Sequence, residues 1–210
     1  VSLLIALGEL LVRHRDIENY IFASLLFIFG ILALQMCFIA ETIVLQHPWL
    51  LFGHFTFLYL VAPAGYFAYF LTVLPSDKLP KNMFLYLVPS IVALILDIYY
   101  MSMPPDAQRA FLDSLLYSGT VEQNLPVRIL LIGAGIQLLA SLGFLLYRFL
   151  MIWIRKGRAR VILISMGYLA FTIVTGEMVI AGHILPSTGL IKWGACLISL
   201  VLPSAFLVSQ

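Results

Sequence analysis

Long apolar runs recur along this chain, and charged residues or prolines close each of them. A helix needs roughly 20 mostly apolar residues to cross a hydrocarbon core about 30 Å thick. Most of the runs reach that length. The composition points the same way, because only 10% of the 210 residues are charged and 62% are apolar, whereas soluble domains have about a quarter charged residues. The sequence therefore predicts a polytopic membrane protein.

The run boundaries predict an all-α fold, a bundle of seven transmembrane helices that forms one domain over residues 1–210. The expected spans are 1–12, 20–45, 49–74, 83–103, 127–154, 161–183 and 188–208. The first run ends at Arg13 and is too short to cross the bilayer, so we expect the sequence to begin partway along that helix.

Lysine and arginine gather in alternate connections between the runs. They are Arg13 and Arg15 in the first, Lys78 and Lys81 in the third, and Arg155, Lys156, Arg158 and Arg160 in the fifth. Short cytoplasmic connections are enriched in these residues. The pattern predicts an N-terminus outside the cell and a C-terminus in the cytoplasm. The small net charge of +2 predicts no nucleic-acid surface on this chain.

Prolines predict where the helices begin, bend and end. Pro48 is expected in the first turn of the third span, where its missing N–H has no cost. Pro104 and Pro105 should end the fourth span, before a long polar connection. The prolines expected inside spans, where they predict kinks, are Pro63, Pro89 and Pro203.

Small residues and cysteines predict packing within the apolar runs. Gly133 and Ala140 lie seven residues apart in the fifth span, a spacing that lets another backbone approach closely. Ordinary bundle packing and a homodimer face both fit this pattern. Cys37 and Cys196 each lie inside an apolar run, so we expect both to be buried and unpaired.

A set of motifs in residues 47–89 carries a resemblance to a known family. The motif residues are His47, Pro48 and Leu50, then Pro63, Tyr66 and Tyr69, then Tyr86 and Pro89. This stretch resembles the N-terminal membrane region of bacterial membrane-bound regulators with an AraC-type DNA-binding domain. It departs from that family at Ala62, where glycine is frequent, and at Tyr86, where histidine is.

The resemblance implies a sensory, signal-transducing input module in the bacterial inner membrane. It also implies a cytoplasmic output domain after Gln210, in the form of a helix-turn-helix regulator, a kinase or a cyclase. The other function classes that stay open are a membrane hydrolase and a small transporter. A hydrolase would hold zinc with residues drawn from Glu41, His54, Glu177 and His183.

Polar side chains inside the apolar runs are the candidates for a functional site, because an ionised group in hydrocarbon costs at least a few kcal/mol without a partner or a cavity. A rise of 1.5 Å per residue places one group in the outer third of the bilayer. The group consists of Glu41, His54, Asp97, Glu177 and Lys192, with Tyr59, Tyr99 and Tyr100 as aromatic neighbours.

Two interpretations of this outer group stay open. In one, Lys192 and Asp97 extend to the lipid headgroups and Glu177 pairs with a neighbouring helix. In the other, the group lines an outward-facing pocket for an unknown small molecule or lipid. No HExxH or other paired-histidine spacing is present, so we expect neither a metal, a cofactor nor an enzyme activity.

Specific contacts are also predicted. Glu177 and Lys192 should face each other, because their spans are joined by a short connection and their depths agree within about one helical pitch of 5.4 Å. His54 should be neutral and hydrogen-bonded, since burial disfavours its charged form. Glu9 and Arg13, four residues apart near the inner boundary, should form a local ion pair.

Overall fold

The computed structural model describes Leu3, Leu4, Ala6 and Gly8 and residues 17–73, 83–117, 125–156, 160–185 and 187–209. All regular elements within these residues are helical. The longer helices are α2 (Ile17–Ala40), α4 (His54–Val73), α5 (Val88–Ser102), α6 (Pro105–Leu116), α7 (Leu125–Lys156), α8 (Arg160–Ile184) and α9 (Thr188–Ser209). The short ones are α3 (Ile43–Gln46) and the 3-10 helices η1 (Pro48–Leu51) and η2 (Met83–Leu87).

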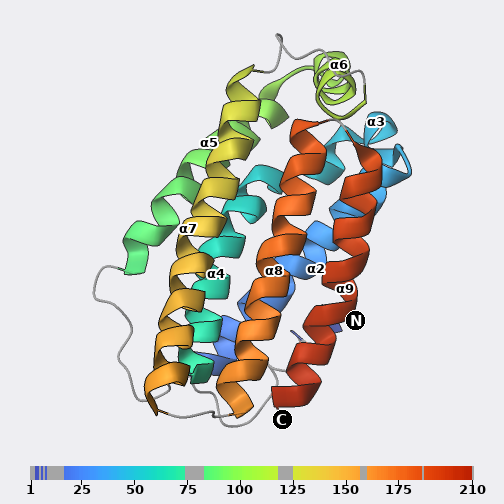
Figure 1. The fold of residues 1–210 in the computed structure, drawn as a ribbon. Coiled ribbons are helices and arrows are strands. Elements are labelled where there is room, and N and C mark those ends of the chain that lie inside the picture. The colour runs from blue at the N-terminus through green and yellow to red at the C-terminus, as the bar shows by residue number, and fades with distance from the viewer. Residues whose placement is uncertain are drawn as a thin grey trace.

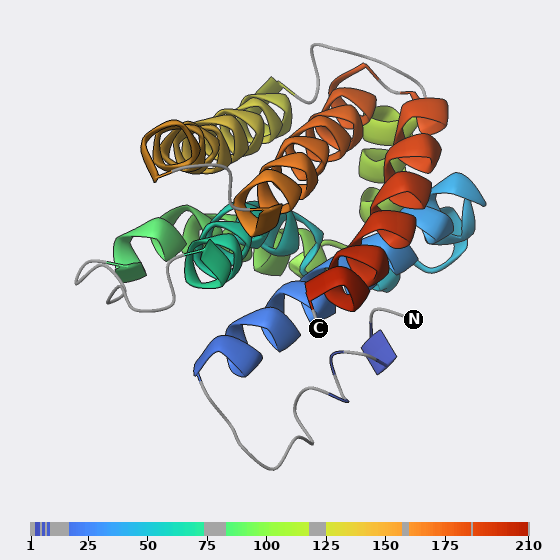
Figure 2. The ribbon, with the colours of Figure 1, turned by 60° about the horizontal axis from the view of Figure 1, so that its bottom comes forward.

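The long helices form a closed ring around a common core. Helix α2 packs against α4 and α9, α7 packs against α4 and α8, and α8 also packs against α9 (Figure 1). Helix α5 lies outside this ring against α4 (Figure 2). In an 18-residue apolar stretch of Pro48–Leu71, which covers most of α4, 61% of the residues are buried, against 22% in a stretch of the same length in Phe84–Ser102, which contains α5. Helix α4 is therefore buried more deeply than α5, which lies at the edge of the bundle.

Helices long and apolar enough to cross a membrane make up most of the described chain. Five such segments are found there: Tyr20–Ala40, Pro48–Leu71, Phe84–Ser102, Val127–Arg155 and Ile162–Ile184. The span expected at 188–208 is helical as α9, but its side chains after Ser199 lie outside the described part. Most of the span expected at 1–12 also lies outside the described residues, and so does the predicted ion pair between Glu9 and Arg13.

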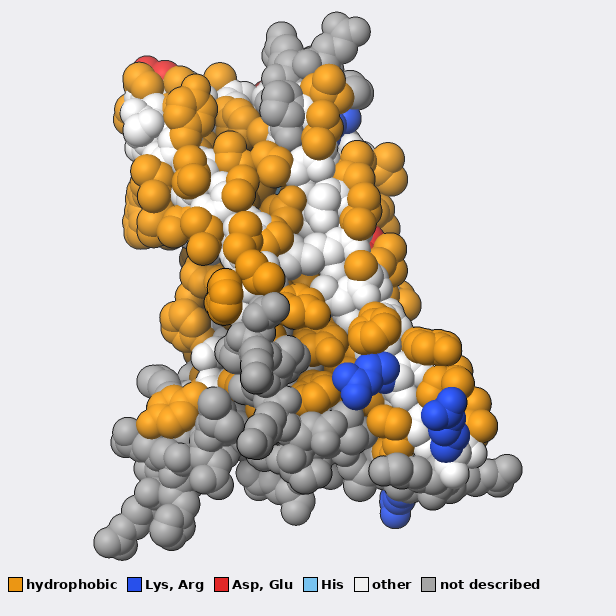
Figure 3. Space-filling model, turned by 90° about the vertical axis from the view of Figure 1, so that its left-hand side faces the viewer, with side chains coloured by type: hydrophobic (Ala, Val, Ile, Leu, Met, Phe, Trp, Pro, Cys, Tyr) orange, Lys and Arg blue, Asp and Glu red, His pale blue; other side chains and the backbone are white. Residues whose placement is uncertain are grey.

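The outer surface of the bundle is apolar. Figure 3 shows one face on which hydrophobic side chains cover most of the described surface. Ile95 on α5 and Ile136 on α7 are each 63% exposed. A contiguous apolar surface of this kind is unfavourable in water and is expected where the surface contacts lipid tails. The surface and the helix lengths together indicate a helical bundle embedded in a membrane.

The segment between α2 and α4 differs from the prediction of a span over 20–45. Helix α2 ends at Ala40, and Thr42 adopts a left-handed backbone with a φ of 57°. Pro48 opens η1 and not α4, which begins only at His54. Gly53 precedes α4 with a φ of 77°, a conformation that favours glycine. A Cβ there would also meet the Phe57 ring at 2.9 Å.

Prolines and polar residues near α5 form more structure than predicted. Pro89 lies in the first turn of α5 and not inside the helix, whereas Pro63 does lie inside α4. The long polar connection predicted after the fourth span contains a helix, α6, which Pro105 opens. At the end of α6, the Tyr117 hydroxyl donates a hydrogen bond of 2.5 Å to the Ile39 carbonyl. Burial, with the charge of Asp113, raises the pKa of Tyr117 to about 12, so this phenol stays protonated at neutral pH.

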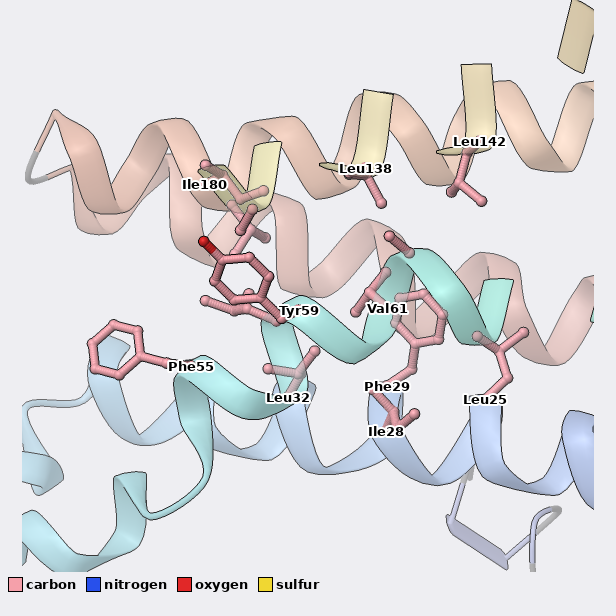
Figure 4. Close-up of a cluster of buried hydrophobic side chains, with 14 of the residues drawn as sticks. Leu25, Ile28, Phe29, Leu32, Phe55, Tyr59, Val61, Leu138, Leu142 and Ile180 are labelled. Atoms are coloured by element: carbon pink, nitrogen blue, oxygen red, sulfur yellow. The ribbon is translucent and has the colours of Figure 1, made fainter. Parts of the chain in front are cut away.

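Small residues of α7 pack within the bundle. Ala134 is buried, and a Cβ at Gly133 would meet the Tyr59 hydroxyl of α4 at 2.7 Å. Figure 4 shows Tyr59 reaching from α4 toward α7 above the core side chains of α2, among them Phe29 and Leu32. The Tyr59 hydroxyl donates to the Leu130 carbonyl at 2.6 Å. Close approach at Gly133 therefore joins α7 to α4.

Candidate functional site

A groove with a volume of about 550 Å³ lies between α2 and α9. The C-terminal end of α2 and the start of α9, which line this groove, lie toward the end of the bundle that carries α3, η1 and α6, here called the α6 end (Figure 1). The lining residues of the groove are Met36, Cys37, Ala40, Glu41, Lys192, Ala195, Cys196 and Ser199. Ligand pockets span about 300 to 1,000 Å³, so the groove has the size of a small-molecule site.

Two of the predicted site residues meet in this groove. The Lys192 Nζ lies 3.6 Å from the Glu41 Oε1, and their side chains are 50% and 69% exposed. An ion pair this exposed contributes little to stability, and water or a ligand can replace either partner. Glu41 and Lys192 therefore provide an exchangeable charged end to an otherwise apolar groove.

The predicted contact between Glu177 and Lys192 is wrong, because Lys192 pairs with Glu41 on α2. Glu177 lies against α7 instead, where a Cβ on Gly135 would be 3.1 Å from its Oε2. The face of α8 that meets α9 holds other residues, including Gly182 beside Ile191. The Oε1 of Glu177 is buried without a hydrogen-bond partner. Equal depth in the bilayer thus does not place two side chains on facing sides of their helices.

A buried chain of polar side chains links α2, α4 and α8. The His54 Nδ1 is 3.0 Å from the Gln35 Oε1, and the His54 Nε2 is 3.1 Å from the His183 Nε2. The His183 Nδ1 is 2.8 Å from the Val179 carbonyl. All three polar side chains are at most 3% exposed. The prediction that His54 is buried and hydrogen-bonded is confirmed, and its partners on α2 and α8 are new.

Asp97 caps helix α4 from the neighbouring α5. Its Oδ2 accepts hydrogen bonds from the Thr56 amide at 2.8 Å and the Thr56 hydroxyl at 2.6 Å, and its Oδ1 accepts from the Phe55 amide at 3.3 Å. These amides are among the free donors of the first turn of α4, and a carboxylate is favoured at that end of a helix. Asp97 is fully buried. It does not reach the headgroups, and its oxygens are engaged within the bundle.

The predicted aromatic residues do not gather around one cavity. Tyr59 is bonded to α7, as described above, and Tyr99 is 62% exposed on the outer face of α5. Tyr100 is buried and lies with His54 and His183 around a small cavity under α6. Its hydroxyl has no hydrogen-bond partner. The outer group predicted from the sequence thus separates into the groove, the histidine chain and the α4 cap.

Several residues of the site were not predicted from the sequence. Gln35 lies in the middle of an apolar run, and this isolated amide was the available signal. Cys37 and Cys196 were expected to be buried, but both are exposed as free thiols in the groove. Their apolar sequence context reflects lipid around the bundle and not a protein core. Within the described residues, no three His, Cys, Asp or Glu side chains gather as a metal site.

Comparison with known proteins adds no further constraint on this site. No model of a protein family, no curated protein and no solved structure matches the chain.

Proposed function

We propose that this chain is the membrane-embedded input module of a signalling protein, and that it binds an amphiphilic small molecule or lipid in the groove between α2 and α9. The observation that carries the proposal is the groove itself, which joins apolar walls to the charged pair of Glu41 and Lys192. Pockets that combine apolar walls with a few polar groups are typical of ligand sites between bundled helices.

The chemistry of the groove favours an amphiphile with an anionic head. Met36, Ala40 and Ala195 provide apolar walls along which an alkyl chain can lie. Lys192 is the cation of the lining, and its present partner Glu41 is mostly exposed. An anionic head can take the place of Glu41 at Lys192 at little cost, because the exposed pair holds little energy.

The packing of α9 supports a route for the signal. Two glycines bring α8 and α9 close together, with Gly182 against Ile191 and Gly194 against Val179. On the opposite side, α9 borders the open groove toward α2. A ligand that fills the groove therefore changes the contact between α9 and α2 more easily than the contact between α9 and α8. In the proposed protein, α9 passes this change to a cytoplasmic output domain that regulates transcription.

The test uses a photoactivatable long-chain fatty acid with the protein in bilayers. We expect crosslinks to map to α2 and α9 around the groove. An uncharged alcohol with an alkyl chain of the same length should label the groove less. Lys192→Met should weaken labelling about two- to fivefold, the range for an exposed ion pair. The control is Arg109→Met, since Arg109 is 52% exposed and forms a similar surface pair with Asp106 outside the groove.

The same groove offers an independent readout through its thiols. Cys37 and Cys196 line it and are free to react with a maleimide. Bound fatty acid should slow their modification in the parent protein, and this protection should be weaker in Lys192→Met. Crosslinks spread over the lipid-facing sides of α5 and α7, with no dependence on Lys192, would rule out the groove as the site.

A further inference from the structure

The hydrogen-bond partners around the buried contact between His54 and His183 determine which of their ring nitrogens carry a proton. The amide nitrogen of Gln35 donates to the carbonyls of Leu50 at 3.2 Å and Phe52 at 3.1 Å. Two carbonyl oxygens can only accept, so this end of Gln35 must be its NH₂ group and the other end its oxygen. The His54 Nδ1 that lies 3.0 Å from this oxygen must therefore carry a proton.

The same reasoning applies on the other side of the contact. The His183 Nδ1 lies 2.8 Å from the Val179 carbonyl, which again can only accept. The His183 Nδ1 therefore also carries a proton. If both rings were neutral, each Nε2 would hold only a lone pair. Two lone pairs would then face each other across the observed 3.1 Å between the Nε2 atoms, which is a repulsive arrangement.

We infer that the His54 and His183 pair is a proton-binding site that holds one proton between its two Nε2 atoms. The distance of 3.1 Å lies within the range of an N–H donor bonded to an acceptor. The proton resides mainly on His183, because this residue lies in the last turn of α8, whereas His54 is the first residue of α4. A cation is favoured at the C-terminal end of a helix and disfavoured at the N-terminal end.

The charged and titratable groups near the histidine pair come from several helices. Asp97 supplies a buried carboxylate at the first turn of α4, next to His54, and all its bonded neighbours are donors, as an ionised carboxylate requires. Tyr100 of α5 borders the adjacent cavity, to which α6 contributes only leucines and Phe111. The other charged groups described at the α6 end are the exposed pair of Glu41 and Lys192, Arg128 of α7, and Asp106, Arg109 and Asp113 of α6.

The proton joins three helices. With it, Gln35 of α2, His54 of α4 and His183 of α8 form one continuous hydrogen-bonded chain. Without it, the two imidazoles repel each other and the link between α4 and α8 is lost. The cavity beside the pair has a volume of only about 10 Å³, and apart from His54, His183 and Tyr100 it is lined by apolar side chains. A site this small has room for no more than about one water, so no organic ligand takes the place of the proton.

A bound proton makes stability depend on pH in a defined way. Above about pH 6.5 the unfolded imidazoles are neutral, while the folded pair still holds one proton. The unfolding equilibrium constant should then rise about tenfold per pH unit until the pair releases its proton. Below about pH 6.5 both imidazoles of the unfolded chain are protonated, against one proton on the folded pair, so stability should fall again. We therefore expect a maximum near pH 6.5.

The experiment compares thermal unfolding of the protein in bilayers between pH 5 and 8 with that of His183→Gln. A glutamine amide can donate to the His54 Nε2 without any added proton. We expect the variant to fold and to lose the decline in stability on the alkaline side. The control is His47→Gln, because His47 is exposed and outside the chain of hydrogen bonds. This control should keep the maximum.

A direct measurement on the wild-type protein keeps the test independent of the variants. Above pH 6.5, where ordinary imidazoles become neutral, nitrogen-15 NMR of histidine-labelled protein in bilayers should show a persistent imidazolium signal that is kept in His47→Gln and absent in His183→Gln. Two neutral rings, with stability independent of pH above 6.5, would overturn the inference. A stoichiometric transition metal in the purified protein, removed by a chelator together with the stability maximum, would overturn it as well.

Discussion

Single residues in this bundle are placed by partners distant in the sequence. Asp97 illustrates this, because the sequence allowed it either to reach the headgroups or to line a pocket, and the structure shows it bonded to Thr56 and Phe55 at the start of α4. The free amides at the start of a helix need an acceptor, and a residue of a neighbouring helix can supply it in place of a residue of the same helix. The polar groups inside the bilayer are thus explained first by the backbone they satisfy.

Asp97→Asn should destabilise the protein by about 1 to 3 kcal/mol, because an asparagine amide has only one oxygen to accept with, so a buried donor of α4 is left unpaired. The midpoint of thermal unfolding measures the loss. Asp106→Asn is the matched control, since Asp106 is almost fully exposed beside Arg109 and its replacement should have little effect. Equal shifts for both variants would contradict the capping role.

Helices α8 and α9 are held together by close backbone approach. A Cβ on Gly182 would lie 2.7 Å from the Ile191 side chain and 3.0 Å from its amide nitrogen. The amide cannot move without moving α9. Their short connection made these helices neighbours in the prediction, but only the packing shows which residues meet. The contact is made by glycines, and the charged residues of both helices point elsewhere.

Gly182→Ala should destabilise the protein by about 1 to 3 kcal/mol, the usual cost of overpacking. Gly167→Ala on the same helix is the control, since nothing lies within 4 Å of a Cβ at Gly167. There, alanine should be neutral or stabilising by up to about 1 kcal/mol through helix propensity. Thermal unfolding of both variants separates the two effects. Stabilisation by both alanines would show that α9 can shift freely at this point.

The whole molecule is polarised along the bundle axis. One end carries α3, η1 and α6, and the other carries the end of α7 and the start of α8 with Arg155 and Arg160 (Figure 1). Cytoplasmic connections are enriched in lysine and arginine. The predicted orientation therefore places the α6 end outside the cell, together with the groove between α2 and α9.

Cysteine labelling in whole cells tests this orientation. In a background of Cys37→Ser and Cys196→Ser, an Ala107→Cys substitution on α6 should react with a membrane-impermeant maleimide. An Arg160→Cys substitution at the opposite end should react only after the membrane is opened. Both positions are exposed, so access to the reagent is decided by the membrane. The reverse pattern would invert the topology and move the groove to the cytoplasmic side.

Helix class and most spans follow from the sequence alone, because the length of an apolar run is a local property and the bilayer sets a fixed minimum for it. Residues 127–154 and 161–183 lie within α7 and α8 for this reason. Two features escaped the same reasoning. The run over 20–45 breaks after Ala40, and the helix α6 forms in the connection that was predicted only to be long and polar. The Tyr117 hydroxyl at the end of α6 donates to the Ile39 carbonyl near the end of α2, a contact between distant residues that no single run predicts.

The features of the candidate site also fall into those that the sequence determined and those that only the tertiary structure decided. The sequence alone determined which polar residues lie in apolar spans and their approximate depth, since depth depends only on residue number and helical rise. Tertiary structure alone decided which of them meet. Rotation of each helix about its axis turned Lys192 toward Glu41 and Glu177 toward α7. The same rotation brought His54 to His183, 129 residues away, because side-chain direction is chosen by the packing of all neighbouring helices together and not by any one of them.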